Sequence, residues 1–472
     1  MESSFLRLRG VSAAAGAIAL ASLVMVPIAS GQGTNGQQTA GQSAGAQQQP
    51  AGGAQKNYKD RGEYDLFSKI TQTQDPKARL DLLNQWQDKY PQTDFAQERL
   101  QYFVATLSQL APTDPASRQK LLDKCKELLA LDPKNFQAMY FTAVWGPPVG
   151  AASPSADLQS QVQSAAQGVI DNASTAFDPG KKPPNVTEAD FTKAKNQALG
   201  VAHNALAWVA STKKDNTTAE NEYKASLQAN PDQGQVSYQY GKLLQEDKSV
   251  PDDQKYPTVL FEYARAAEYT GPGQVPAASQ AQIMDYFKKV YAQYHGGTDG
   301  EDQLLSQAKT SALPPEGFAI GSAAKAAQGE AEKLQARINS DPAFKIWYAI
   351  KQSLTGDQGE QFFNSNVKET DVPGGAEGVK GFSGTIISID PPDHPTKVVL
   401  GVEDPTKPDA TLEFSQPLAA TALDKIKVGE KLEFSGVADS YTKDPYMLTF
   451  KDPTVPGVQT TAPARKATRH KH

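Results

Sequence analysis

The sequence has almost no cysteine: Cys125 is the single one among 472 residues. A disulfide framework is therefore excluded, and any folded part of the chain must be held together by core packing. Because Cys125 falls on the apolar stripe of an expected helix, we interpret it as a buried, unreactive thiol.

Histidine is also scarce, and the motifs of common active sites are absent. No pair of histidines has metal-ligand spacing within a segment that is expected to fold; the five are His203, His295, His394, His470 and His472. His203 is interpreted as a packing residue. The segments that are expected to fold contain neither a Gly-x-Ser-x-Gly motif nor a P-loop. We therefore expect no metal, no cofactor and no catalytic residue, which predicts a protein that is not an enzyme.

Neither sign of charge is in strong excess, since 47 Lys and Arg face 53 Asp and Glu for a net charge of −6. This balance argues against binding to nucleic acid or to an anionic membrane surface. The exception is the end of the chain, 458–472, which we expect to be a disordered basic tail. Its cationic residues are Arg465, Lys466, Arg469 and Lys471.

One long apolar run is present, from Val11 to Ile28, with Arg7 and Arg9 before it and small residues after it. This order is typical of a secretory signal peptide, here residues 1–31. An uncleaved anchor is the alternative, because the run is nearly long enough to span a bilayer. Its richness in Ala, Gly and Ser favours cleavage, so we expect an exported protein, periplasmic or secreted, without stable membrane insertion. Residues 32–57, rich in Gln, Gly and Ala, are expected to form a disordered spacer.

The clearest pattern lies between Gly200 and Pro231 and predicts two helices joined by a polar turn. Large, small, aromatic and proline positions follow one another in a fixed order; they are Leu206, Ala207, Ala210, Ala219, Tyr223, Ser226 and Pro231. This order resembles the tetratricopeptide repeat (TPR). In that pattern Ala207 and Ala219 allow two helix backbones to approach, while Leu206 and Tyr223 fill the seam. The resemblance implies a helical solenoid that binds other proteins.

Weaker versions of the same hairpin extend over residues 58–320, for which we expect four or five units with insertions. Irregular helical hairpins that are not true repeats remain an alternative. Expected helices are Lys77–Tyr90, Ser117–Leu131, Asn135–Trp145, Ala156–Thr175, Val259–Tyr269, Ile283–Tyr294 and Asp302–Ala312.

Local signals predict where several of these helices begin and end. Gly146-Pro147-Pro148 is expected to end one helix, and Thr217 with Glu220 to cap another. Asp341-Pro342 opens a later helix, which we expect to cover the end of the array. Residues 321–377 are accordingly interpreted as capping helices and linker.

Residues 378–457 change to an alternating pattern. Strands are expected at Gly381–Ile389, Lys397–Val402, Thr411–Phe414, Lys431–Ala438 and Tyr446–Lys451, with a short helix at Ala419–Ile426. This order is similar to the OB-fold, a small five-stranded barrel. The whole chain is therefore predicted to be an α+β multidomain protein.

The barrel is expected to have an acidic outer surface that is poor in aromatic rings. Between Lys380 and Asp452, 8 Lys and no Arg face 12 Asp and Glu, which argues against nucleic-acid binding. Tyr441 is the one aromatic candidate, in a loop. Alternation places Leu412, Phe414, Leu432 and Phe434 inside the barrel, and Thr411, Glu413, Lys431 and Glu433 outside.

The TPR resemblance implies a groove lined by the first helix of each unit. Its inner wall would fall on Asn204, Trp208, Tyr238 and Lys242. Trp208 could equally pack between neighbouring helices. We expect a non-enzymatic scaffold or adaptor for unidentified protein partners in the cell envelope, with a homo-oligomer also possible. The alternative is a carbohydrate-binding module that holds a cell-wall oligosaccharide on the OB-like domain.

Overall fold

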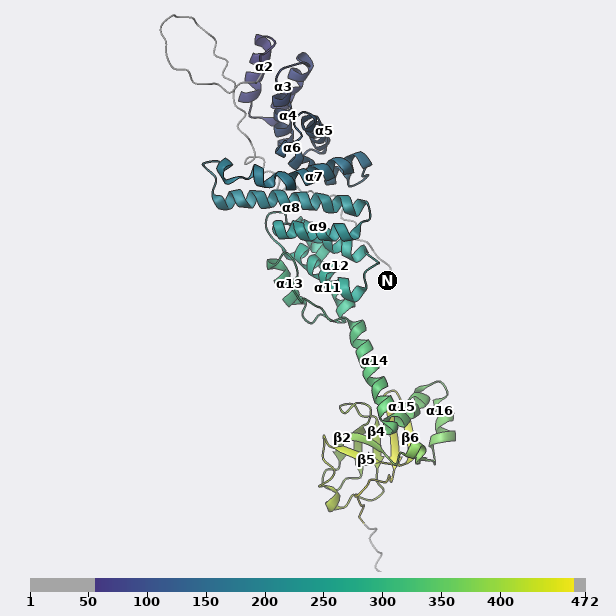
Figure 1. Ribbon diagram of the computed structural model, residues 1–472. Helices are drawn as coiled ribbons and strands as arrows, with labels where there is room; N and C mark the ends of the chain where they lie inside the picture. The colour runs from purple at the N-terminus through teal and green to yellow at the C-terminus, as the bar shows by residue number, and fades with distance from the viewer. Residues whose placement is uncertain (1–55, 462–472) are drawn as a thin grey trace, which may run out of the picture. The chain divides into compact units, whose positions relative to one another are not determined.

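The computed structural model describes residues 56–461 and divides the chain into two units, one up to Ala323 and one from Ala324 (Figure 1). The first unit is helical, whereas the second contains helices and a curled sheet. The expected mixed α+β class is thereby confirmed. The expected signal peptide, nearly all of the expected spacer and the basic end beyond Thr461 lie outside the described residues.

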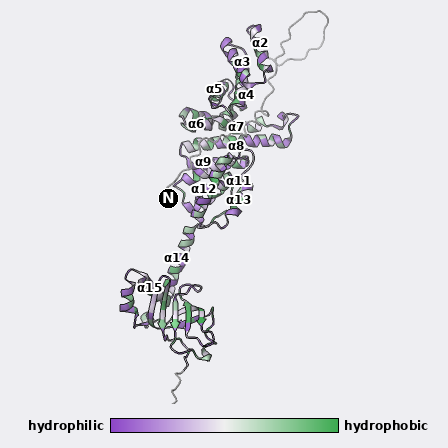
Figure 2. Cartoon of the chain, turned by 180° about the vertical axis from the view of Figure 1, so that it is seen from behind, coloured by the Kyte–Doolittle hydropathy of each residue, from purple (hydrophilic) through white to green (hydrophobic). Residues whose placement is uncertain are grey.

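In the first unit, helices from α2 to α12 that follow one another in the sequence pack against one another, most extensively α8 with α9 and α10 with α11, whereas α13 packs against α11. The helices of this unit are α2 Arg61–Gln72, α3 Pro76–Lys89, α4 Ala96–Leu110, α5 Pro115–Leu131, α6 Phe136–Gly150, α7 Ala156–Ala176, α8 Glu188–Thr212, α9 Asn216–Ala229, α10 Gly234–Glu246, α11 Asp252–Glu268, α12 Ala277–His295 and α13 Glu301–Thr310. Each carries both hydrophilic and hydrophobic residues along its length (Figure 2).

Aspartate followed by proline starts three of the helices. Asp75, Asp114 and Asp341 each accept a hydrogen bond from a backbone N–H of the first turn, and the next residue is proline. The carboxylate satisfies an N–H that has no partner within the helix, and proline needs no donor at that position. These starts therefore follow from local sequence.

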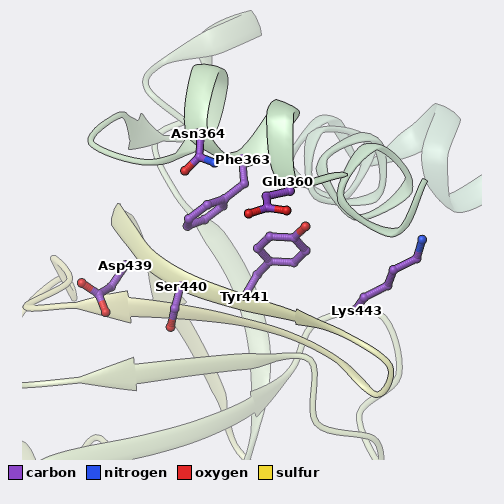
Figure 3. A pocket seen from close by; sticks show the side chains of 7 residues that line it. All are labelled: Glu360, Phe363, Asn364, Asp439, Ser440, Tyr441 and Lys443. Carbon is purple, nitrogen blue, oxygen red and sulfur yellow. The ribbon is translucent and has the colours of Figure 1, made fainter. Parts of the chain in front are cut away.

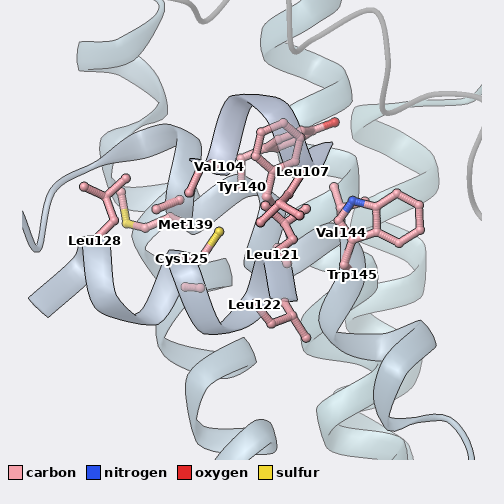
Figure 4. Packing of buried hydrophobic residues seen from close by; sticks show 14 of the residues in the cluster. Val104, Leu107, Leu121, Leu122, Cys125, Leu128, Met139, Tyr140, Val144 and Trp145 are labelled. Carbon is pink, nitrogen blue, oxygen red and sulfur yellow. The ribbon is translucent and has the colours of Figure 1, made fainter. Parts of the chain in front are cut away.

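The helices of the first unit share two hydrophobic cores. One core lies mainly among α3 to α8 and contains Cys125, Trp86 and Trp145 (Figure 4). The other lies among α8 to α13 and contains Tyr240 and Phe261.

The two helices of the clearest repeat make contact through small residues. Ala207 of α8 and Ala219 of α9 are both fully buried, and Ala210 and Tyr223 are each 6% exposed. The Ser226 hydroxyl donates to the Gly200 carbonyl at 2.7 Å and so joins the two helices. Leu206 is half-buried against the first core, and Pro231 is exposed just after α9 ends.

Two local predictions in the first unit are wrong. The Gly146-Pro147-Pro148 sequence does not end its helix, because α6 runs on to Gly150 with both prolines inside it. Gly146 is needed for packing, since a Cβ there would lie 2.1 Å from a methyl carbon of Val162 on α7. Packing against α7 and α8 thus overrides the local stop signal.

The predicted capping box of α9 is wrong as well. Asp215 caps the helix by accepting from the Thr218 N–H at 3.1 Å. Glu220 instead pairs with Lys224 one turn later, at 2.7 Å. The helix α11 also begins earlier than the expected Val259, because it starts at Asp252 and includes Pro257.

The second unit contains a seven-stranded curled sheet, so the expected five-stranded closed barrel is wrong. Its strand order is β1-β6-β7-β4-β3-β2-β5. The strands are β1 Asp371–Val372, β2 Phe382–Asp390, β3 Lys397–Gly401, β4 Ala410–Glu413, β5 Lys431–Phe434, β6 Gly436–Lys443 and β7 Tyr446–Lys451.

Each of the five expected strand ranges contains a strand, but two details differ. The range 431–438 is divided between β5 and β6, because Gly436 has φ of 156° and lies against Pro453. A residue with a side chain rarely adopts this conformation, so the chain changes direction there. The expected helix at 419–426 is reduced to a 3₁₀ turn, Ala420–Ala422.

Residues assigned to the linker and the tail belong to the second unit. Its helices are α14 Ala323–Ser340, α15 Pro342–Thr355 and α16 Gly359–Phe362, followed by a π-helical turn, Phe363–Val367. At the other end, Leu418 forms a β-bridge with Thr460, so regular structure extends beyond the expected boundary at 457.

The sequence led us to expect that α15 covers the end of the array, but its apolar face packs in the core of the second unit. Its Trp347 is fully buried in the core of the second unit. The Trp347 ring lies 5.2 Å from that of Phe382 and 6.2 Å from that of Phe434, centre to centre. The helix and the sheet therefore form one core.

Four arginines bind backbone carbonyl groups where the chain leaves a helix or strand. Arg99 binds the end of α3, Arg118 the end of α4, and Arg337 the residues after β3. Arg265, 2% exposed, donates to the carbonyls of Ala308, Ser311 and Pro231 at 2.5 to 3.0 Å. Each guanidinium also lies over an aromatic ring; the rings are Trp86, Trp145, Phe344 and Tyr269.

Replacing Arg265 with methionine is expected to destabilise the first unit by about 3 kcal/mol or more. The change leaves three carbonyls without their donor, and an unpaired buried polar group costs about 1–3 kcal/mol. Urea denaturation followed by circular dichroism measures the effect. Arg61→Met is the control, because this side chain is 92% exposed and should change stability by under about 0.5 kcal/mol. Equal midpoints for the two variants would contradict the role of Arg265.

Replacing Trp347 with alanine is expected to destabilise the second unit by about 3–5 kcal/mol, because the change leaves a cavity. Hydrogen exchange should show lost protection in strands β2 to β7 and unchanged protection in α2 to α13. Gln352→Ala, an exposed position on the same helix, provides the control. Loss of protection in the first unit instead would restore the capping role for α15.

Candidate functional site

The four residues expected to line a groove do not form one cluster. Trp208 is half-buried on the first core, with its ring against Gly150, whereas Tyr238 packs against the second core. Asn204 is half-buried, and its Oδ1 atom has no hydrogen-bond partner among residues 56–461. Lys242 is exposed and lies 3.7 Å from Glu246 on the same helix. The Trp208 ring thus packs against α6 while part of its surface stays accessible.

Tyr238 instead belongs to a group of tyrosines on α10, α11 and α12. The ring of Tyr263 lies 5.9 Å from that of Tyr238 and 5.6 Å from that of Tyr286, centre to centre. Tyr256 stacks on Tyr294 at 5.3 Å. We call these five residues the tyrosine cluster. Tyr263 is buried, and the other four are half-buried, so the cluster presents aromatic surface to solvent.

Gln245 of α10 fixes two members of the tyrosine cluster through its side-chain amide. Its Oε1 accepts from the Tyr263 hydroxyl, and its Nε2 donates to the Tyr286 hydroxyl, both at 2.8 Å. Because one amide joins α11 to α12 in this way, the rings are held in place before any partner arrives.

Burial further favours the uncharged form of four phenol groups in the cluster. It is the largest cause that raises the pKa of Tyr238, Tyr256, Tyr263 and Tyr294 above the usual value. The cluster therefore offers neutral hydroxyls beside apolar ring surface, a combination enriched where proteins bind one another.

Glu262, next to Tyr263 in sequence, is a buried acid. It is fully buried, and neither carboxylate oxygen has a hydrogen-bond partner in the described part of the chain. Burial raises the pKa of Glu262 to about 8, against smaller opposing effects of Ser237 and Arg265. Near neutral pH this acid is therefore largely protonated inside the first unit.

The second unit contains an open cleft of about 430 Å³ between β6 and the segment that follows α15 (Figure 3). Glu360 and Asn364 line it from the helical side, and Asp439, Tyr441 and Lys443 from β6. The sequence prediction missed this cleft because its two sides are about 80 residues apart.

Tyr441 is not in a loop, as we expected, but on strand β6. Its ring packs against Phe363, with centres 5.0 Å apart. Gly359 lies nearby, where a Cβ would be 2.0 Å from the Leu354 carbonyl oxygen and 3.1 Å from the Tyr441 hydroxyl oxygen. The Lys443 ammonium donates to the Gly356 carbonyl at 3.2 Å and fixes the far end of the cleft.

Elsewhere on the sheet, the predicted inward residues Leu412, Phe414, Leu432 and Phe434 are buried, and Glu413, Lys431 and Glu433 are exposed. Thr411 differs from the expectation, since it is 4% exposed. Its hydroxyl lies 3.1 Å from the sulfur of Met447, which covers it.

The remaining candidate residues have structural surroundings. Cys125 is fully buried, and burial raises the pKa of its thiol to about 12. His203 lies with its Nδ1 2.7 Å from a carboxylate oxygen of Glu222, so it joins α8 to α9. Within residues 56–461 no group of three or more His, Cys, Asp or Glu is placed to hold a metal ion. His470 and His472 lie outside that range.

No described helix is both long enough and apolar enough to cross a membrane. No protein-family model, curated protein or solved structure matches this chain.

The stability of the first unit should fall as the pH rises, and Glu262 should cause it. Its pKa is about 8 in the folded chain against the usual 4.5. Its stabilising effect is therefore complete below about pH 4.5 and lost as the pH rises through 8, at up to ~1.4 kcal/mol per pH unit. Glu262→Gln should remove this slope and be more stable than wild type at pH 8, by urea denaturation.

Asp285→Asn, an exposed acid on α12, is the control and should keep the wild-type slope. A wild-type stability that is constant between pH 5 and 8 would show that Glu262 stays ionised in the folded protein.

Proposed function

We propose that this protein is a non-enzymatic, exported adaptor that binds a protein partner through the tyrosine cluster of its first unit. The observation that carries the proposal is the arrangement of that cluster: the half-buried rings of Tyr238 and Tyr286 contact the buried ring of Tyr263, and Gln245 fixes two of the hydroxyls. Tyrosine is enriched among the residues that contribute most to binding energy at protein interfaces.

The rigidity of the cluster supports binding rather than mere packing. Association costs free energy when loose side chains must be ordered, about 0.5–1.5 kcal/mol for each. Gln245 already orders the side chains of Tyr263 and Tyr286 in the folded chain, so binding does not have to order them. A partner segment with apolar side chains could cover the parts of the rings that remain accessible to solvent.

The order of the N-terminal residues supports export: a basic start, an apolar run and small residues at 29–31. The spacing of small and aromatic residues on α8 and α9, with Ala207 and Ala219 buried between them, supports a TPR-like unit. Partners would then be proteins of the same exported compartment.

The test is affinity capture from the exported protein fraction with the full chain as bait. Tyr238→Ala combined with Tyr286→Ala removes two half-buried rings from the cluster. We expect wild type to retain a defined partner and the double variant to lose at least about tenfold in affinity, since each such ring commonly contributes over 1 kcal/mol. Circular dichroism confirms that the variant is folded.

The matched control is Tyr64→Ala on α2, a tyrosine that is 50% exposed and lies outside the cluster. It should retain the partner as well as wild type does. Equal retention by the double variant would contradict the proposed site, and capture of no protein by wild type would contradict the adaptor function.

A further inference from the structure

The cleft of the second unit has the chemistry of a ligand site that is separate from the tyrosine cluster. At about 430 Å³ it falls within the ~300–1,000 Å³ of small-molecule sites. It combines one aromatic platform with charged and polar groups from two different segments. We infer that this cleft binds a neutral saccharide, with the sugar ring against Tyr441 and its hydroxyls on the surrounding polar side chains.

The charges in the cleft argue against the other ligand classes. Glu360 and Asp439 are both exposed carboxylates, and Lys443 is the one cation among the lining residues. Two carboxylates against one ammonium repel phosphates and other anions. A purely apolar ligand would offer no hydrogen bond to Glu360, Asp439, Asn364 or Ser440.

A polyol satisfies this set of groups. Its hydroxyls can donate to the carboxylates of Glu360 and Asp439, and can accept from the amide of Asn364 and the ammonium of Lys443. The C–H face of a sugar ring gives apolar contact to an aromatic ring such as Tyr441.

The aromatic platform is held in a fixed position. Phe363, 7% exposed, supports the Tyr441 ring from the helical side, and Figure 3 shows Glu360 and Phe363 directed toward that ring. Tyr441 and Lys443 are two residues apart on β6 and therefore lie on the same face of the strand. A ligand would thus meet a site that needs little rearrangement.

The test uses the full chain and saturation-transfer difference NMR with three neutral probes: cellobiose, maltose and N,N′-diacetylchitobiose. We expect at least one to show transfer to its ring C–H protons, which reports stacking on Tyr441. Glu360→Gln and Asp439→Asn should each weaken that binding by about tenfold, because each removes a charge-assisted hydrogen bond. Neither change touches the Phe363–Tyr441 contact, so both variants should fold.

Glu433→Gln is the matched control, since this exposed carboxylate lies on β5 outside the cleft and should leave binding unchanged. We take a Kd of ~1 mM as the weakest affinity that counts as specific binding. If none of the three probes shows transfer at ~10 mM, ten times that Kd, the inference is overturned. Transfer that is unchanged in both cleft variants would overturn it as well.

The main rival ligand is a cation, which two carboxylates and a tyrosine ring could also hold. Arginine methyl ester is the probe for it. If this cation binds, weakens in Glu360→Gln and Asp439→Asn, and no saccharide binds, the cleft is a cation site and the saccharide inference is wrong. Loss of the saccharide signal would leave the tyrosine cluster untouched, so the result is independent of the proposed adaptor function.

Discussion

Backbone carbonyls at the end of a helix lack partners within that helix, and this chain meets the need repeatedly with arginine. Arg99, Arg118, Arg265 and Arg337 each bind at least two carbonyls of another segment and lie over an aromatic ring. A planar guanidinium suits this geometry, because it donates along several directions while its face stays apolar. Because the chain has a single cysteine and so no internal disulfide, these arginine contacts help to hold neighbouring segments together.

The helix α11 contributes both to the stability of the first unit and to the surface that we propose for binding. Its Arg265 binds the carbonyl ends of neighbouring segments, its Glu262 is buried without a partner, and its Tyr263 lies at the centre of the tyrosine cluster. These residues lie within four consecutive positions of the helix, and Glu262 and Arg265, three positions apart, share one side of it. The surface that we propose for binding is therefore tied directly to the most buried polar contacts of the first unit.

Local signals in the sequence were sufficient where the physical cause was local. Asp341 with its following proline starts a helix as expected, and each expected strand range contains a strand. Predictions failed where contacts between distant residues decide the outcome. Gly146 packs against Val162, so α6 continues through two prolines. Trp347 of α15 packs against the sheet of the second unit. The candidate sites also depend on contacts between residues far apart in the sequence. Gln245 and Tyr286, for example, are 41 residues apart, and no local pattern links them.

Cys125 gives this chain a built-in reporter. It is fully buried, its thiol is held protonated, and no second cysteine exists to confuse the signal. A thiol reagent can reach it only when the surrounding helices separate, so the labelling rate counts these openings. The natural chain, with no engineered probe, therefore records how often its first core opens.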